Sequence, residues 1–151
     1  MVDPLGEVRS FLVPLDGTDA SYNAFAVVCD IARRTRAKVS ALHVIEVPRS
    51  QPLDASLAAE TDRAEAILTR AEEIAGEHDV RVECELLQAR EAGQALVDEA
   101  VDQRTDAVVV GLDYHRPYGR FELGRLPQYV LTNAPCQVWL IRYPPEPADD
   151  G

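Results

Sequence analysis

A chain of 151 residues, with 46% apolar and 27% charged side chains, has the composition of one globular domain that can bury a core. Its 26 acidic residues outnumber its 15 basic ones, and the net charge of −11 disfavours nucleic acid and anionic lipid as bulk partners. No apolar run approaches the roughly 20 residues that cross a bilayer, and the N-terminal sequence lacks a secretory pattern, so we expect a cytoplasmic protein without a membrane partner.

Two kinds of segment alternate along the chain. Short apolar segments that end at Gly, Pro or Asp are typical of buried strands, and longer segments with apolar residues at helical spacing are typical of amphipathic helices. In chain order they predict a strand at 8–15, a helix at 18–36, a strand at 38–47, a helix at 54–78, a strand at 80–88, a helix at 91–103, a strand at 106–111, a helix at 121–132 and a strand at 136–142. We expect Thr18 or Asp19 to cap the first helix and Asp54 to cap the second.

This alternation predicts an α/β fold. Apolar strands separated by amphipathic helices indicate an open, doubly wound and mainly parallel sheet with helices on both faces. One such domain spans 8–142, and we expect 1–7 and the Pro-rich, acidic 143–151 to be flexible. Ligands of such sheets bind beyond the carboxyl ends of the strands. The turns at Asp16 and Gly111, which follow the first and fourth strands, are therefore the places to look for a site.

The segment GLDYHRPYGRFELGR, residues 111–125, follows the fourth strand and contains three glycines. Glycine permits positive φ and lets backbone N–H groups approach phosphate oxygens with no side chain between them. The segment is therefore a candidate phosphate-binding loop, although several of its other residues are bulky or charged.

Four segments, in this order and spacing, carry a resemblance to a known family. They are FLVPLDGTDAS, VSALHVIEV, QAREAGQALVDEAVDQRTDAVVVG and NAPCQVWLIR. From about Val8 to Arg142 the chain resembles the universal stress protein (UspA-like) family. The resemblance implies a Rossmann-like, adenine-nucleotide hydrolase-like architecture with a five-stranded sheet of order 3-2-1-4-5. It also implies a homodimer in which the last strand, Gln137 to Arg142, pairs with its copy and covers an exposed sheet edge.

In ATP-binding members of that family the loop after the fourth strand reads Gly-x2-Gly-x9-Gly-Ser/Thr. Counting from Gly111 places Tyr114 at the second glycine, Gly124 at the third and Arg125 at the hydroxyl residue. The tyrosine adds a ring where phosphates would pass, and the arginine replaces a hydroxyl that would donate to phosphate at a helix N-terminus. We therefore expect ATP binding to be lost or weakened. The alternative is that arginine charge replaces the backbone donors and a nucleotide still binds, through Arg116, Arg120 and Arg125.

Residues near the ends of the first two strands complete the site that the resemblance implies. Pro14 and Leu15 would line the base pocket, and Val44 would offer a backbone contact to adenine. Asp16 would accept a hydrogen bond from a ribose hydroxyl or the adenine edge. Asp16 has a second interpretation as a turn residue that accepts backbone N–H groups of the next helix, and Val44 has one as strand core.

The sequence offers little support for catalysis. It contains neither a G-x-S-x-G segment nor a Cys/His signature. Cys29, Cys84 and Cys136 are not at metal-ligand spacing, so we expect reduced core thiols and no metal. We expect His43, alone on an apolar strand, to be a hydrogen-bonded core residue. The protein is thus predicted not to be an enzyme, with slow ATP hydrolysis left open.

The sequence therefore predicts a cytoplasmic homodimer in stress response that acts by binding and has no firmly predicted cofactor. Two alternatives stay open. One is a sensor that binds ATP or AMP through Asp16, Gly111, Gly124 and the loop arginines. The other is a protein-interaction module whose loop serves a protein partner and binds no small ligand.

Overall fold

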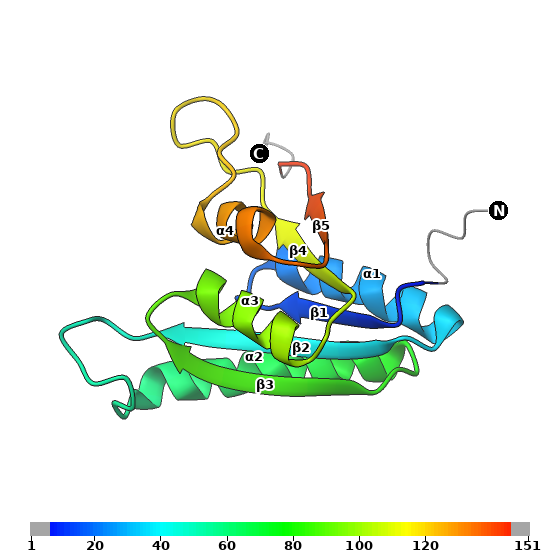
Figure 1. The fold of residues 1–151 in the computed structure, drawn as a ribbon, viewed down its shortest axis with the longest axis horizontal. Coiled ribbons are helices and arrows are strands. Elements are labelled where there is room, and N and C mark those ends of the chain that lie inside the picture. The colour runs from blue at the N-terminus through cyan, green and yellow to red at the C-terminus, as the bar shows by residue number, and fades with distance from the viewer. Residues whose placement is uncertain (1–6, 146–151) are drawn as a thin grey trace, which may run out of the picture.

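The computed structural model describes residues 7–145, in which five strands alternate with four helices (Figure 1). The elements are β1 (Ser10–Pro14), α1 (Asp19–Thr35), β2 (Lys38–Glu46), α2 (Ala58–Glu77), β3 (Val82–Ala89), α3 (Ala92–Asp102), β4 (Ala107–Leu112), α4 (Arg125–Asn133) and β5 (Gln137–Arg142). Among these helices, none is long and apolar enough to cross a membrane. The α/β alternation predicted from the sequence is confirmed.

The five strands form one sheet in the order β3-β2-β1-β4-β5. β1 lies at the centre, where Leu12 pairs with Ser40 of β2 and with Val108 of β4. Every neighbouring pair is parallel, so the predicted order is confirmed and the sheet is parallel throughout. Since parallel strands end at the same edge, the segments that follow β1, β2 and β4 all emerge from one edge of the sheet (Figure 1).

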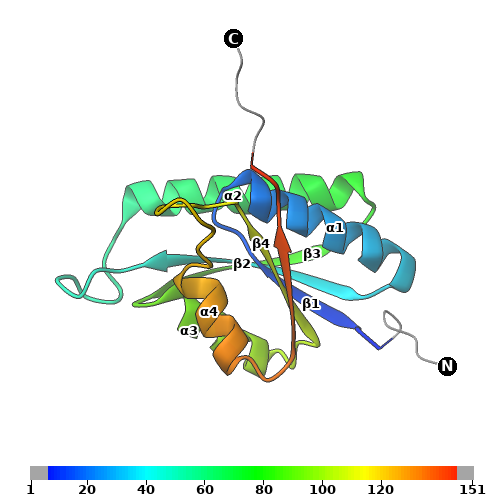
Figure 2. The ribbon, with the colours of Figure 1, turned by 90° about the horizontal axis from the view of Figure 1, so that it is seen from above.

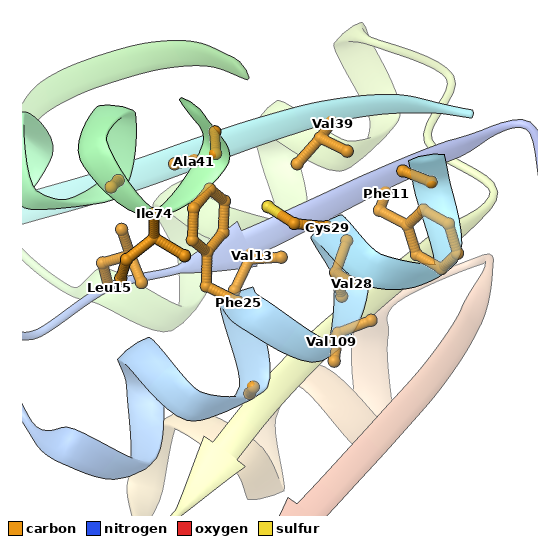
Figure 3. Packing of buried hydrophobic residues seen from close by; sticks show 14 of the residues in the cluster. Phe11, Val13, Leu15, Phe25, Val28, Cys29, Val39, Ala41, Ile74 and Val109 are labelled. Atoms are coloured by element: carbon orange, nitrogen blue, oxygen red, sulfur yellow. The ribbon is translucent and has the colours of Figure 1, made fainter. Parts of the chain in front are cut away.

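The helices cover both faces of the sheet, with α1 and α2 on one side and α3 and α4 on the other (Figure 2). Figure 3 shows Phe25 of α1 beside Val13 of β1 in the larger of the two core clusters. Leu12, the neighbour of Val13, points the other way and packs with Leu96 of α3 in the second cluster. Both faces of β1 are thus buried, which explains the apolar run from Phe11 to Pro14.

The second helix begins later than the sequence predicts. α2 starts at Ala58, and its N-cap is Leu57, so Asp54 does not cap it. The cause is a contact made by β3, because the amide Nε2 of Gln88 donates to the carbonyls of Leu53 (2.9 Å) and Ala55 (3.1 Å). Those carbonyls are held by the sheet rather than by a first helical turn. The first helix follows the prediction, since Oγ1 of Thr18 caps it by accepting from the N–H of Ser21 at 3.2 Å.

The fourth helix is also shorter than predicted, because α4 starts at Arg125 and not at residue 121. Gly124 precedes it with φ 82° and ψ 168°, a conformation that interrupts any helix arriving from residue 121. Directly after β5, the N–H of Tyr143 donates to the carbonyl of Leu112 at 2.8 Å and continues the pairing of β4 with β5 by one residue. Of the two flanks predicted to be flexible, 1–6 and 146–151 lie outside the described residues.

Candidate nucleotide site

A cavity of about 290 Å³, here called the central cavity, lies at the carboxyl ends of β1, β2 and β4. Five of the predicted site residues line this cavity, namely Pro14, Leu15, Asp16, Val44 and Gly111. The other lining residues are Ser21, Leu42, His43, Glu46, Ala92, Leu96, Val110, Leu112, Leu126 and Pro127. Most of these are apolar, so the cavity suits a flat, largely apolar group such as a nucleobase.

Asp16 holds the turn after β1 and also lines the central cavity. Its Oδ1 accepts from the backbone N–H of Thr18 at 2.9 Å and from the Thr18 hydroxyl at 2.6 Å. This geometry matches the turn interpretation. Oδ2 has no hydrogen-bond partner within the described residues, so the same carboxylate keeps a free acceptor at the cavity.

His43 forms part of the cavity wall instead of being enclosed in the core. It is half-buried, and its Nδ1 lies 2.6 Å from the carbonyl oxygen of Leu15. This bond ties β2 to the segment after β1, as does the backbone bond from the N–H of Leu15 to the carbonyl of Leu42 at 2.9 Å. The expected hydrogen bond of this histidine is confirmed, and its effect is to fix the shape of the cavity.

Gly111 and Gly124, the two glycines that match the family loop, are required for different structural reasons. A Cβ at Gly111 would lie 2.7 Å from the carbonyl carbon of Ala20 and 2.9 Å from Cβ of Ala24, so β4 can pass this close to α1 only at a glycine. A Cβ at Gly124 would make only an ordinary contact with the Pro127 ring, at 3.9 Å, so this glycine is needed for its positive φ of 82° at the start of α4. Gly111 lines the central cavity, and Gly124 does not.

Tyr114 lies outside the lining of the central cavity. Its ring stacks on Phe121 with centroids 5.7 Å apart, and the guanidinium of Arg142 lies 4.7 Å from the Tyr114 centroid and 4.9 Å from that of Phe121. Arg116 lies 5.3 Å from the same tyrosine ring. These contacts fasten the loop to the end of β5. Tyr118, at the loop tip, is 85% exposed and packs little against the protein.

Arg125 lines a second cavity of about 260 Å³, here called the α3–α4 cavity. Its walls are Glu46, Glu91, Ala92, Gly93, Gln94, Arg125, Leu126 and Tyr129, and three of these, Glu46, Ala92 and Leu126, also line the central cavity. A further hollow on the α2 side contains Arg63, whose guanidinium donates to the carbonyl of Asp16 at 3.3 Å. The central cavity therefore adjoins one arginine on each side.

The loop arginines do not gather into one anion site. Arg116 lies over the Tyr114 ring, and Arg120 is paired with Glu122 at 3.9 Å, an exposed contact that contributes little. Only Arg125 of the three predicted arginines lines a cavity that adjoins the central one.

The lining from α3 and α4, such as Leu96 and Leu126, could not be assigned from sequence because helical spacing shows that a helix has a buried face without showing which element that face contacts.

The cysteines fit the predicted role as core thiols. Burial raises the pKa of Cys29 to about 12, and burial followed by the nearby Glu72 carboxylate raises the pKa of Cys84 to about 11. Both groups are therefore thiols, not thiolates, at neutral pH and are poor nucleophiles. Within residues 7–145, no cluster of three His, Cys, Asp or Glu residues could hold a metal.

Comparison with known proteins agrees with this architecture. The model of the universal stress protein family matches residues 7–142. A universal stress protein of Thermus aquaticus is 32% identical over 138 residues, which cover 89% of this chain and 98% of that protein. A universal stress protein of Archaeoglobus fulgidus, solved with dAMP, has a TM-score of 0.71 and is 19% identical. The match covers 87% of this chain and 96% of that protein. A further universal stress protein, solved with cAMP, has a TM-score of 0.69 and is 22% identical. The match covers 89% of this chain and 97% of that protein.

Proposed function

Because the chain belongs to the universal stress protein family, we propose that it binds an adenine nucleotide in the central cavity and acts by binding, without catalysis. The observation that carries the proposal is the position of this cavity, beyond the carboxyl ends of three parallel strands, with the Asp16 carboxylate on its wall. Two proteins of the same fold have been solved with cAMP and with dAMP, which supports the choice of ligand.

The lining residues suit the nucleoside part of such a ligand. Pro14, Leu15 and Val44 offer apolar surface to the base. The free Oδ2 of Asp16 would accept a hydrogen bond from a ribose hydroxyl, while Oδ1 keeps the turn in place through Thr18. A volume of about 290 Å³ matches a nucleoside better than a complete triphosphate.

ATP is the weaker candidate among adenine nucleotides. The family loop is altered at Tyr114 and Arg125, so a polyphosphate would meet fewer backbone donors there. The wall between the central and α3–α4 cavities includes the carboxylate of Glu46, which repels additional phosphate charge. We propose that affinity falls from AMP to ATP.

We further propose that the protein works as a cytoplasmic homodimer in stress response, joined through β5. This strand lies at one edge of the sheet, its interior residues Val138 to Ile141 are half-buried, and its outer backbone edge faces no other strand of residues 7–145. An uncovered edge of this kind favours association with a second strand. Sedimentation velocity across a concentration series tests the assembly, and a monomer at every concentration would refute it.

Thermal unfolding with added nucleotide tests the binding proposal. AMP should raise the Tm in proportion to RT ln(1 + [AMP]/Kd), because it binds the native state. Asp16→Asn should weaken AMP binding about tenfold, since the amide keeps an acceptor for Thr18 but places a donor where Oδ2 accepted. The matched control is Asp19→Asn, which removes the same charge from the first turn of α1 outside the cavity lining. A Tm that stays constant up to millimolar AMP would refute nucleotide binding.

A second candidate function applies if nucleotide binding fails. The loop tip with Tyr118, 85% exposed, stands on a base fastened by the Tyr114, Phe121 and Arg142 contacts. Tyrosine and arginine are the side chains that most often dominate protein interfaces. A protein-interaction module would therefore use this tip.

A further inference from the structure

The α3–α4 cavity adjoins the central cavity, in which the nucleoside is proposed to bind. Its volume is about 260 Å³, and its separate lining comes from the start of α3 and the first turns of α4. The central cavity, at about 290 Å³, lies at the lower end of the roughly 300–1,000 Å³ typical of small-molecule sites. A ligand larger than a nucleoside would therefore continue into a neighbouring space.

The direction of that continuation follows from α4. Arg125 is the first residue of this helix and lines the α3–α4 cavity, and among the described residues no side chain caps the helix. A phosphate that leaves the central cavity on this side would meet one guanidinium and the positive end of a helix. On the α2 side, by contrast, Arg63 is already bonded to the carbonyl of Asp16.

The other polar side chains that line the α3–α4 cavity favour a ligand with hydroxyl groups over one with further phosphates. Glu46 and Glu91 are two carboxylates, which at neutral pH only accept hydrogen bonds. Gln94 adds an amide that both donates and accepts, and Tyr129 adds a ring. One arginine beside two carboxylates cannot neutralise a polyphosphate, whereas sugar hydroxyls can donate to both carboxylates.

From this arrangement we propose that the ligand is an adenine nucleotide whose phosphate carries a hydroxyl-rich group, with ADP-ribose as the representative compound. The nucleoside lies in the central cavity, the phosphates pass Arg125, and the second sugar occupies the α3–α4 cavity against Glu91 and Gln94. This inference rests on the proposed function, because it needs the nucleoside in the central cavity.

Calorimetric titration of the full-length protein with AMP, ATP and ADP-ribose tests the proposal. ADP-ribose should bind about tenfold more tightly than AMP, the gain expected from a hydrogen bond to a charged group. ATP should bind more weakly than AMP. If AMP binds and ADP-ribose binds no more tightly, this inference is wrong and the proposed function stands. If neither compound binds, both are wrong.

Variants in α3 identify the cavity that the sugar occupies. Glu91→Gln and Gln94→Ala should each remove most of the advantage of ADP-ribose over AMP, and Gln94→Ala should change AMP affinity less than about twofold, because Gln94 is uncharged and does not line the central cavity. The matched control is Asp102→Asn, which removes one acidic charge at the far end of the same helix and should preserve the advantage. Retention of the full advantage in both test variants would overturn the assignment to the α3–α4 cavity.

Discussion

Gly111 lies where β4 passes closest to α1. A Cβ there would come within 3 Å of the carbonyl carbon of Ala20, and backbone atoms cannot move aside as the end of a flexible side chain can. The residue also lines the central cavity, so a glycine selected by helix packing coincides with one expected from the phosphate-loop pattern. The packing explanation and the phosphate-loop explanation differ in the effect that a substitution of Gly111 should have on the stability of the protein without ligand.

Gly111→Ala should destabilise the protein by about 1–3 kcal/mol without any ligand, because overpacking a tight contact strains the backbone. Chemical denaturation measures the change. Gly76→Ala is the control, since a Cβ at Gly76 in α2 meets nothing within 4 Å and the substitution should stabilise by up to about 1 kcal/mol through helix propensity. Equal stability of Gly111→Ala and the wild type would show that packing does not require this glycine.

Individual residues were predictable from the sequence where their chemistry is local. The turn role of Asp16 follows from the Asp-Gly-Thr sequence itself, and the structure shows that bond. The packing role of Gly111 was not predictable, because its neighbour Ala20 is about ninety positions earlier in the chain. A single sequence contains no signal for the distance between a strand and a helix that are so far apart.

The loop between β4 and α4 is organised by side chains from a different element. Arg142, the last residue of β5, lies over both Tyr114 and Phe121, which stack on each other. The backbone N–H of Glu122 donates to the carbonyl of His115 at 2.9 Å and closes the base of the loop. These contacts keep the tyrosine ring out of the lining of the central cavity.

Arg142→Gln should loosen this loop while leaving the fold intact, because each lost cation–π contact contributes about 0.5–1 kcal/mol at an exposed site. Trypsin cleavage after Arg120, identified by mass spectrometry, should become several-fold faster under native conditions, since local opening controls cleavage. Arg33→Gln, at an exposed position in the last turn of α1, is the control and should leave the rate unchanged. An unchanged rate in Arg142→Gln would mean that the backbone alone holds the loop.

Elements were predicted more accurately than their ends. Four strands follow from apolar runs and the third from an alternation of apolar and charged residues, so all five were found within a few residues. The starts of α2 and α4 were missed because Gln88 holds the segment before α2 and Gly124 interrupts the helix before α4. The position of Tyr114 was also beyond the sequence, because it depends on Arg142, which lies on β5 rather than in the loop.

The molecule carries a net charge of −11, and two of its carboxyl groups, those of Glu85 in β3 and Glu99 in α3, lie next to each other. A side-chain hydrogen bond to Glu99 of α3, then partial desolvation and the Glu99 charge, raise the pKa of Glu85, an exposed residue of β3, from 4.5 to about 7. The nearby Glu83 raises it further, and Lys38 opposes the shift. The carboxyl of Glu85 therefore keeps in the folded protein a proton that the unfolded chain would release at lower pH.

The sign of the resulting pH dependence follows from linkage. The folded state binds more protons than the unfolded chain between pH 4.5 and about 7, so this group's contribution is fully present below pH 4.5 and lost as the pH rises through about 7. Glu85→Gln keeps a hydrogen-bond donor toward Glu99 at every pH. The Tm of this variant, measured relative to wild type, should therefore increase from pH 5 to pH 8. Glu72→Gln, an exposed residue of α2 away from this pair, is the control for net charge. A Tm difference between Glu85→Gln and wild type that does not change with pH would show that the two carboxylates do not share a proton.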